Sequence, residues 1–270
     1  MFFSKKFLTN IFLAASLTVQ ALEASLITKL FGPSERVHLG SDQATQWYQD
    51  KAHEFLKYFD VKDADAIEIL KLSWHMHPEY RLIPGMTGKS GIWINEAVLE
   101  KFDEQERLWV IAHETAHYAY HHVWKKIGLG LTVKIVSSIP AALMGAYLVW
   151  RINHDDELRT KALWQNMLNG ASMGLIGGMY AIDFQATGSL LLNNKARKYE
   201  IEADLMAAQM LCVNGYQATV QVHIQTLSSW ISEGRAVWNV VDHPSLEESL
   251  VYLQAFWDTY SKILNANQPL

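Results

Sequence analysis

Apolar residues recur with helical spacing in three stretches of the chain. Residues 41–59 form one amphipathic helix whose apolar face carries Trp47, Tyr48, Phe55, Leu56 and Phe59. Residues 217–232 and 245–264 show the same periodicity, whereas residues 67–72 are typical of a strand. The pattern therefore predicts a mainly α protein with a small β-sheet, of the α+β class.

The two most hydrophobic stretches, residues 127–150 and 163–192, flank a polar loop at residues 151–161. This arrangement predicts a helical hairpin, with aromatic residues of the interfacial type close to the loop, namely Tyr147, Trp150 and Trp164. Four residues oppose a full membrane span because each is costly in lipid unless it faces protein or water: Lys134, Pro140, Asp183 and Gln185. A spanning or embedded hairpin and a hairpin packed on the soluble domain stay as alternatives, and membrane contact of some kind is favoured.

Residues 1–24 have the pattern of a bacterial secretory signal. Two lysines, Lys5 and Lys6, precede a short apolar run over residues 7–19, and small residues suited to cleavage follow it. An uncleaved signal anchor is the alternative. Either segment would export the single domain that follows, residues 25–270, so we expect a protein of the bacterial cell envelope, in the periplasm and associated with a membrane.

The residues with the most specific chemistry are His113, Glu114 and His117, which form an HExxH motif. A capping pair, Asp103 and Glu106, precedes them and predicts that they lie on a helix. Two histidines four residues apart on a helix can bind one zinc ion, and the glutamate between them can take a proton from a water molecule at the metal. A hydrolytic zinc site usually has three protein ligands, so the motif requires a third ligand from elsewhere in the chain.

Composition narrows the choice of partners. The net charge of -5 offers no electrostatic footprint for nucleic acid. The single cysteine, Cys212, permits no intramolecular disulfide, and its place on an apolar helix face predicts a buried side chain. We therefore expect no nucleic-acid partner, whereas the HExxH motif predicts protein or peptide substrates and the apolar hairpin predicts contact with membrane lipid.

A second predicted helix begins near Arg197 and contains Glu200 and Asp204 one turn apart, with Ala203 between them. HExxH followed, after an apolar insert, by this R-x-x-E-x-x-A-D pattern resembles the HtpX-like and BepA-like zinc endopeptidases. That family also includes the CAAX prenyl protease and the mitochondrial inner-membrane stress proteases. The resemblance extends over about residues 65–260 and implies a zincin-like metalloprotease domain of the gluzincin type.

The resemblance also implies roles for individual residues. One zinc ion per chain would be bound by His113, His117 and Glu200. Asp204, with Arg197 nearby, would support these ligands, because a carboxylate on the other ring nitrogen of a ligand histidine fixes its tautomer and orientation.

Two further segments resemble the family more loosely. Residues 91–95 are similar to the strand ahead of HExxH, which implies that they lie along the cleft and pair with an extended substrate backbone. Residues 242–248 resemble a His-Pro segment, without the arginine that often follows it. This likeness implies that His243 comes near the zinc, either as a donor to the oxyanion or as a neutral ligand that blocks the open position. A histidine at a helix entry with no catalytic role is the alternative.

Three other polar residues near the motifs are interpreted as structural. Glu202 points to a different helix face from Glu200 and is predicted to be a solvated charge. His121 and His122 are predicted to be packing or surface residues, because a fourth protein ligand would close the site to water.

The sequence thus predicts a zinc metalloendopeptidase in which Glu114 is the general base and later returns the proton to the leaving amine. The resemblance implies quality control of envelope and membrane proteins. Two other classes stay open: an exported zinc-binding chaperone or adaptor without turnover, and a secreted protease effector that inserts into a membrane.

Overall fold

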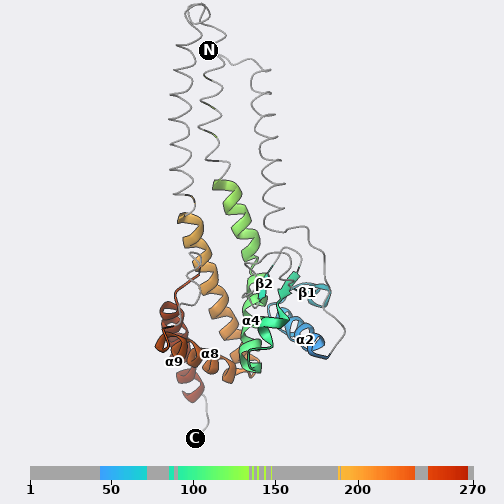
Figure 1. Cartoon of the computed structure of the whole chain (residues 1–270), viewed down its shortest axis with the longest axis vertical. Coiled ribbons are helices and arrows are strands. Elements are labelled where there is room, and N and C mark those ends of the chain that lie inside the picture. Colours follow the sequence, from blue (N-terminus) through green and yellow to red (C-terminus); the bar gives the residue numbers. More distant parts are fainter. Residues whose placement is uncertain are drawn as a thin grey trace, which may run out of the picture. The chain divides into compact units, whose positions relative to one another are not determined.

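The computed structural model describes residues 43–71, 85–87, 91–133, 188, 190–234 and 243–266, with four single positions between 136 and 147 (Figure 1). The predicted signal at residues 1–24 and the polar loop at residues 151–161 lie outside the described residues. The chain divides into two compact units. Residues 34–126 and 193–270 form the larger unit, and residues 1–33 and 127–192 form the other.

The larger unit is mainly helical, as predicted. Its named elements are α2 (Gln43–Tyr58), the short helix η1 (Ala64–Ala66), β1 (Glu68–Lys71), β2 (Gly85–Thr87), β3 (Gly91–Ile94), α3 (Glu96–Leu99), α4 (Glu104–Ala119), α8 (Gln217–Ser232) and α9 (Leu246–Ala266). Further helical residues follow α4 at 122–133 and precede α8 at 190–213. The three predicted helices and the strand at residues 67–72 are confirmed, with ends that differ by at most two residues.

The described strands form one sheet in the order β1-β3-β2. β3 pairs with β1 in parallel, with Ile92 opposite Ile69, and with β2 in antiparallel orientation. Gly91 permits this close pairing, because a Cβ added there would lie 2.3 Å from the backbone oxygen of Glu68. Since both sides of β3 are occupied by strands, the expectation that residues 91–95 themselves pair with a substrate backbone is wrong. The edge strand beside α4 is β2.

The core lies where α2, the sheet, α4, residues 193–213 and α8 meet. Its fully buried apolar side chains include Phe55, Leu56, Ile92, Ile94, Ile111, Met210, Leu211 and Val220. Each such side chain contributes about 1.5–3 kcal/mol through removal of its apolar surface from water. Because α4 packs against α2 on one side and α8 on another, the position and rotation of this helix are fixed.

Local features fix both ends of α4. At its start the side chain of Asp103 accepts a hydrogen bond of 2.8 Å from the backbone N–H of Glu106, as the sequence predicted. Such a cap is worth about 1 kcal/mol. At its end His121 has a left-handed φ of 56°. The chain therefore changes direction there, and the next helical residues begin at His122.

In the smaller unit, the described helical positions carry exposed apolar side chains, namely Val136, Ile139, Leu143, Tyr147, Leu190 and Leu191. Within the part of the chain that the structure describes, no helix has the length and hydrophobicity that a membrane crossing requires. Most of residues 127–192 lie outside that part. The hairpin therefore stays a prediction.

Candidate active site

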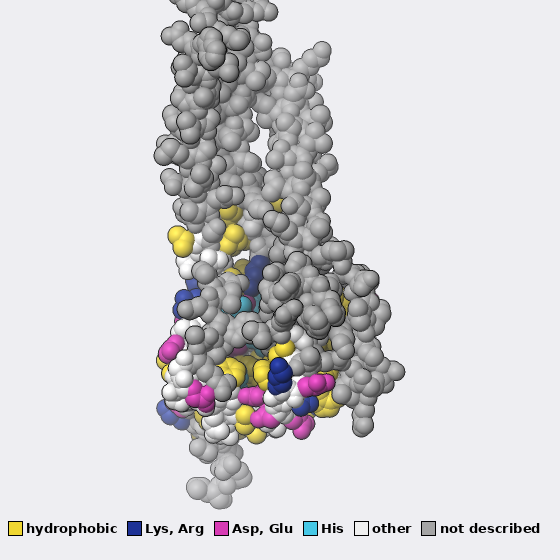
Figure 2. All heavy atoms as spheres, in the orientation of Figure 1, with side chains coloured by type: hydrophobic (Ala, Val, Ile, Leu, Met, Phe, Trp, Pro, Cys, Tyr) yellow, Lys and Arg dark blue, Asp and Glu magenta, His cyan; other side chains and the backbone are white. Residues whose placement is uncertain are grey.

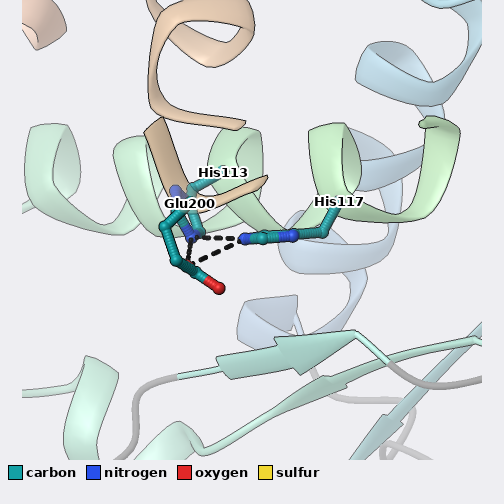
Figure 3. Close-up of side chains that lie close together, drawn as sticks. All are labelled: His113, His117 and Glu200. Carbon is teal, nitrogen blue, oxygen red and sulfur yellow. Dashed lines mark hydrogen bonds and ion pairs between the residues drawn. The ribbon is translucent and has the colours of Figure 1, made fainter. Parts of the chain in front are cut away.

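Helix α4 presents the two motif histidines one turn apart. The rings of His113 and His117 converge, and their Nε2 atoms lie 3.0 Å apart (Figure 3). Both side chains are largely buried, with exposed fractions of 19% and 8%. The packing of α4 against two helices thus brings two ring nitrogens to one point.

Helical residues 190–213 bring the third group to that point. Glu200 is buried, and its Oε2 lies 3.1 Å from Nε2 of His117 and 3.4 Å from Nε2 of His113. Figure 3 shows the carboxylate facing both rings from a second helix. Among the described residues these three form the group of His, Cys, Asp or Glu side chains that could hold a metal ion.

The spacing of the three ligand atoms fits zinc. With Zn–N and Zn–O distances near 2.0–2.2 Å, tetrahedral ligand atoms lie roughly 3.3 Å from one another. The observed separations are 3.0, 3.1 and 3.4 Å. Two imidazoles and one carboxylate also match the donor set of a hydrolytic zinc site, which leaves a fourth position for water.

Asp204, one turn after Glu200, contacts the first motif histidine on the ring nitrogen that does not face Glu200. Its carboxylate lies 2.7 Å from Nδ1 of His113 and accepts a hydrogen bond there. The hydroxyl of Tyr252 donates to the other oxygen of Asp204. Burial and the Asp204 charge raise the pKa of Tyr252, so this hydroxyl stays a donor. Burial lowers the pKa of His113, but the charge and hydrogen bond of Asp204 raise that pKa well above its ordinary value, which favours the protonated ring in the metal-free site. With a metal ion in place of the Nε2 proton, Nδ1–H would still donate to Asp204 and the Nε2 lone pair would face the metal.

Lys126 contacts the carboxylate that faces the histidines. Its ammonium group donates a hydrogen bond of 2.9 Å to Oε1 of Glu200, the oxygen opposite the one that faces the rings. Burial alone would raise the pKa of Glu200, but in the metal-free site the motif histidines, His117 above all, and the Lys126 ammonium hold that pKa well below its ordinary value. Glu200 is therefore ionised, which is the form that binds a cation.

Glu114 lies on α4 between the two histidines but is outside the group of three. The hydroxyl of Thr87 on β2 lies 2.8 Å from Oε2 of Glu114 and 2.6 Å from its backbone oxygen. Gly85 makes room for this carboxylate, because a Cβ added there would lie 3.1 Å from Cγ of Glu114. The edge strand thus holds the Glu114 carboxylate outside the ligand group, and the charge of this carboxylate still acts on His113.

A fully buried histidine lies behind the second motif histidine. Nδ1 of His122 is 3.0 Å from Nδ1 of His117, and its Nε2 is 3.3 Å from Oε2 of Glu202. The prediction that His122 is a packing residue rather than a ligand agrees with this position. Glu202, predicted to be a solvated charge rather than a ligand, is half exposed and also contacts His122.

The two remaining predicted residues lie near the start of α9. Nε2 of His243 is 3.4 Å from Oε2 of Glu200, while the side chain remains 47% exposed. Arg197 forms an ion pair with Glu248, which joins residues 190–213 to α9 and involves none of the predicted metal ligands. The structure therefore places His243 next to the Glu200 carboxylate, and it places Arg197 in a contact that supports residues 190–213.

Sequence reasoning missed Thr87, Lys126 and Tyr252. Thr87 belongs to a strand of only three residues, and Tyr252 lies in a helix far along the chain from Asp204. Lys126 follows His122 by one helical turn, which was a usable signal that both side chains point the same way.

The fold and the site define a mainly helical protein with a candidate metal centre of two histidines and one glutamate. The profile of peptidase family M48 matches residues 44–256, which include every element of that centre. The chain therefore belongs to peptidase family M48.

One curated relative is a CAAX prenyl protease 1 homolog from Dictyostelium discoideum, 25% identical over 165 residues. The match covers 61% of this chain but only 37% of the relative. No solved structure matches the chain.

Proposed function

We propose that the protein is a zinc-dependent metalloendopeptidase that hydrolyses peptide bonds in proteins. The observation that carries the proposal is the meeting of His113, His117 and Glu200 at zinc-ligand distances, with Glu114 beside them and outside the ligand set. Membership of peptidase family M48 supports it. Figure 2 shows acidic and basic side chains interspersed over the described part of the face that it draws.

The residues would divide the chemistry between them. When bound by His113, His117 and Glu200, zinc supplies a Lewis acid that polarises the scissile carbonyl and acidifies a water molecule. Glu114 takes the proton of the attacking water and later delivers it to the leaving amine. Thr87 orients the Glu114 carboxylate for both transfers.

His243 is placed to act on the same cluster. Its Nε2 lies 3.4 Å from Oε2 of Glu200, the oxygen that faces both motif histidines. As a donor it would stabilise the developing oxyanion, whereas as a neutral imidazole it would occupy the open position until substrate displaces it.

We also propose that an extended substrate runs along β2. β3 is inside the described sheet, while β2 is its edge and carries the Thr87 contact to Glu114. Backbone pairing at that edge would bring a scissile bond past the general base.

For the cellular setting we propose an exported, membrane-associated enzyme of the bacterial envelope that removes misassembled proteins. The signal-like residues 1–24 and the apolar residues 127–192 support this setting. The exposed Val136, Ile139 and Leu143 support contact of the second segment with lipid.

The deciding experiment compares the purified protein with Glu114→Gln. Glu114 contacts Thr87 and is not in the ligand group, so the variant should bind zinc stoichiometrically and lose roughly a hundredfold or more of its casein cleavage. Metal content and cleavage rate are measured on the same samples. Cleavage that persists in Glu114→Gln contradicts the mechanism, and zinc binding without any cleavage by the unmodified protein favours the chaperone or adaptor.

A further inference from the structure

We propose that His122 is a positioning residue for the metal centre. It accepts a hydrogen bond from the Nδ1–H of His117, is itself oriented by Glu202, and so keeps Nε2 of His117 available to the metal. This inference rests on the proposed function, because it gives His122 and Glu202 a role in the same site.

The first step is the contact between the two rings. Nδ1 of His122 and Nδ1 of His117 are 3.0 Å apart, and the His122 side chain is 0% exposed. Two ring nitrogens at this distance share one hydrogen, which one of them donates. A neutral histidine that binds a metal through Nε2 carries its hydrogen on Nδ1. His117 is therefore the donor and His122 the acceptor.

The second step follows from the other nitrogen of His122. Because its Nδ1 accepts, its hydrogen must lie on Nε2. That nitrogen faces Oε2 of Glu202 at 3.3 Å, which is an acceptor at the required place. The ring of Tyr199 stacks on His122 with centroids 4.9 Å apart and planes within 16° of parallel. The ring cannot rotate freely, so the tautomer and the orientation of His122 are both determined.

The third step is the comparison with the first motif histidine. His113 has a carboxylate, Asp204, directly on its Nδ1. By contrast, Nδ1 of His117 contacts His122, and His122 in turn contacts Glu202, which lies on the same helix as Asp204. Partners of this kind on ligand histidines typically change metal affinity by roughly 10- to 100-fold when they are removed.

Removal of the acceptor at His122 would leave the Nδ1–H of His117 buried without a partner. The His117 ring could then transfer its hydrogen to Nε2 or rotate, and either change removes a lone pair from the metal position. The loss should therefore appear in zinc affinity, separately from any effect on folding.

The test compares three substitutions in the full-length, detergent-purified chain. His122→Asn keeps an acceptor oxygen near the place of Nδ1, whereas His122→Leu removes the acceptor and keeps an apolar side chain. Glu202→Gln keeps an acceptor for Nε2 and serves as the mild variant. The zinc dissociation constant is measured by competition with a chelator, and the thermal midpoint of the zinc-free protein reports folding separately.

We expect His122→Leu to weaken zinc binding by roughly 10- to 100-fold, while His122→Asn and Glu202→Gln stay within about threefold of the unmodified protein. Zinc affinity unchanged in His122→Leu overturns the inference, as does an equal loss in His122→Asn and His122→Leu. Neither result affects the proposed function, which fails only if the unmodified protein does not bind zinc or does not cleave.

A spectroscopic measurement keeps the inference testable if His122→Leu does not fold. Imidazole ¹⁵N shifts of the zinc-loaded protein distinguish the two neutral tautomers. We expect the hydrogen of His117 on Nδ1 and that of His122 on Nε2. A hydrogen on Nδ1 of His122 would overturn the inference.

Discussion

At the scale of single residues, one helix supplies three carboxylates to the site within five positions, and each meets a different partner. Glu200 faces both motif histidines, Glu202 contacts His122, and Asp204 contacts His113. Helical geometry explains the division, because residues four apart share a face while a residue two apart points elsewhere. Only Glu200 is therefore in position to bind the metal directly.

Because the three carboxylates have different contacts, their substitution should affect zinc binding to different extents. Glu200→Ala should lose zinc and peptidase activity together, because one of three ligands is gone. Asp204→Ala should weaken zinc binding by roughly 10- to 100-fold, because His113 loses the partner that fixes its tautomer. Metal content after dialysis and casein cleavage are the measurements. If Glu202→Ala removes zinc as fully as Glu200→Ala, the assignment of the ligand on this helix is wrong.

His243 gives a prediction whose sign identifies its role. If its ring donates to the oxyanion, His243→Ala should lower turnover by roughly 100-fold. If the ring occupies the open metal position, the same change should raise basal activity, because water and substrate then reach the metal without competition. Turnover on a generic protein substrate is measured at matched zinc content. An unchanged rate with zinc retained would remove His243 from the site.

At the scale of elements, the small sheet controls where Glu114 can lie, since β2 packs beside α4 and carries Thr87. The sheet itself depends on the close approach of β1 to β3 at Gly91. Gly91→Ala should lower the free energy of unfolding by about 1–3 kcal/mol, because the new Cβ would clash with a backbone oxygen that cannot move independently.

The control for Gly91→Ala is Gly128→Ala. Gly128 is helical, and a Cβ added there meets nothing within 4 Å, so alanine should be neutral or stabilise by up to about 1 kcal/mol. Urea unfolding of both variants gives the comparison. Equal stability of the two would show that β1 and β3 do not approach as closely as the structure indicates.

The sequence predicted the helices and the first strand well because their apolar residues have a clear period. It also predicted the Asp103 cap and, through the resemblance, the meeting of His113, His117 and Glu200. It did not predict that β3 is the middle strand, because pairing partners are set by the folded chain and not by the composition of one strand. Thr87 and Tyr252 were missed for a related reason: their partners lie far away in the sequence, and a lone threonine or tyrosine carries no local signal.

At the scale of the whole molecule, the metal ligands all belong to the larger unit, while the apolar residues 127–192 are inserted between α4 and the helix of Glu200. The segment that we propose to contact lipid therefore joins the two halves of the metal centre in sequence. In sequence, residues 122–133 lead from α4 into that segment, and residues 190–213 lead out of it to Glu200.

The proposed membrane contact leads to a prediction about topology. If residues 127–192 span a membrane as a hairpin, the loop at residues 151–161 lies on the opposite side from the zinc site. Arg151, Arg159 and Lys161 favour a cytoplasmic loop, because basic residues in short loops tend to remain inside and acidic residues oppose this only weakly. A cysteine introduced at Asn153 should then resist an impermeant thiol reagent in intact cells and react after permeabilisation.

Cys212 is buried and must be replaced by alanine in the same protein so that it does not contribute to the signal. A cysteine at a predicted periplasmic site in the exposed part of α9, such as Gln254→Cys, provides the accessible control. Labelling at both positions in intact cells would reject the spanning hairpin and support one that packs against the soluble domain or lies on the membrane surface.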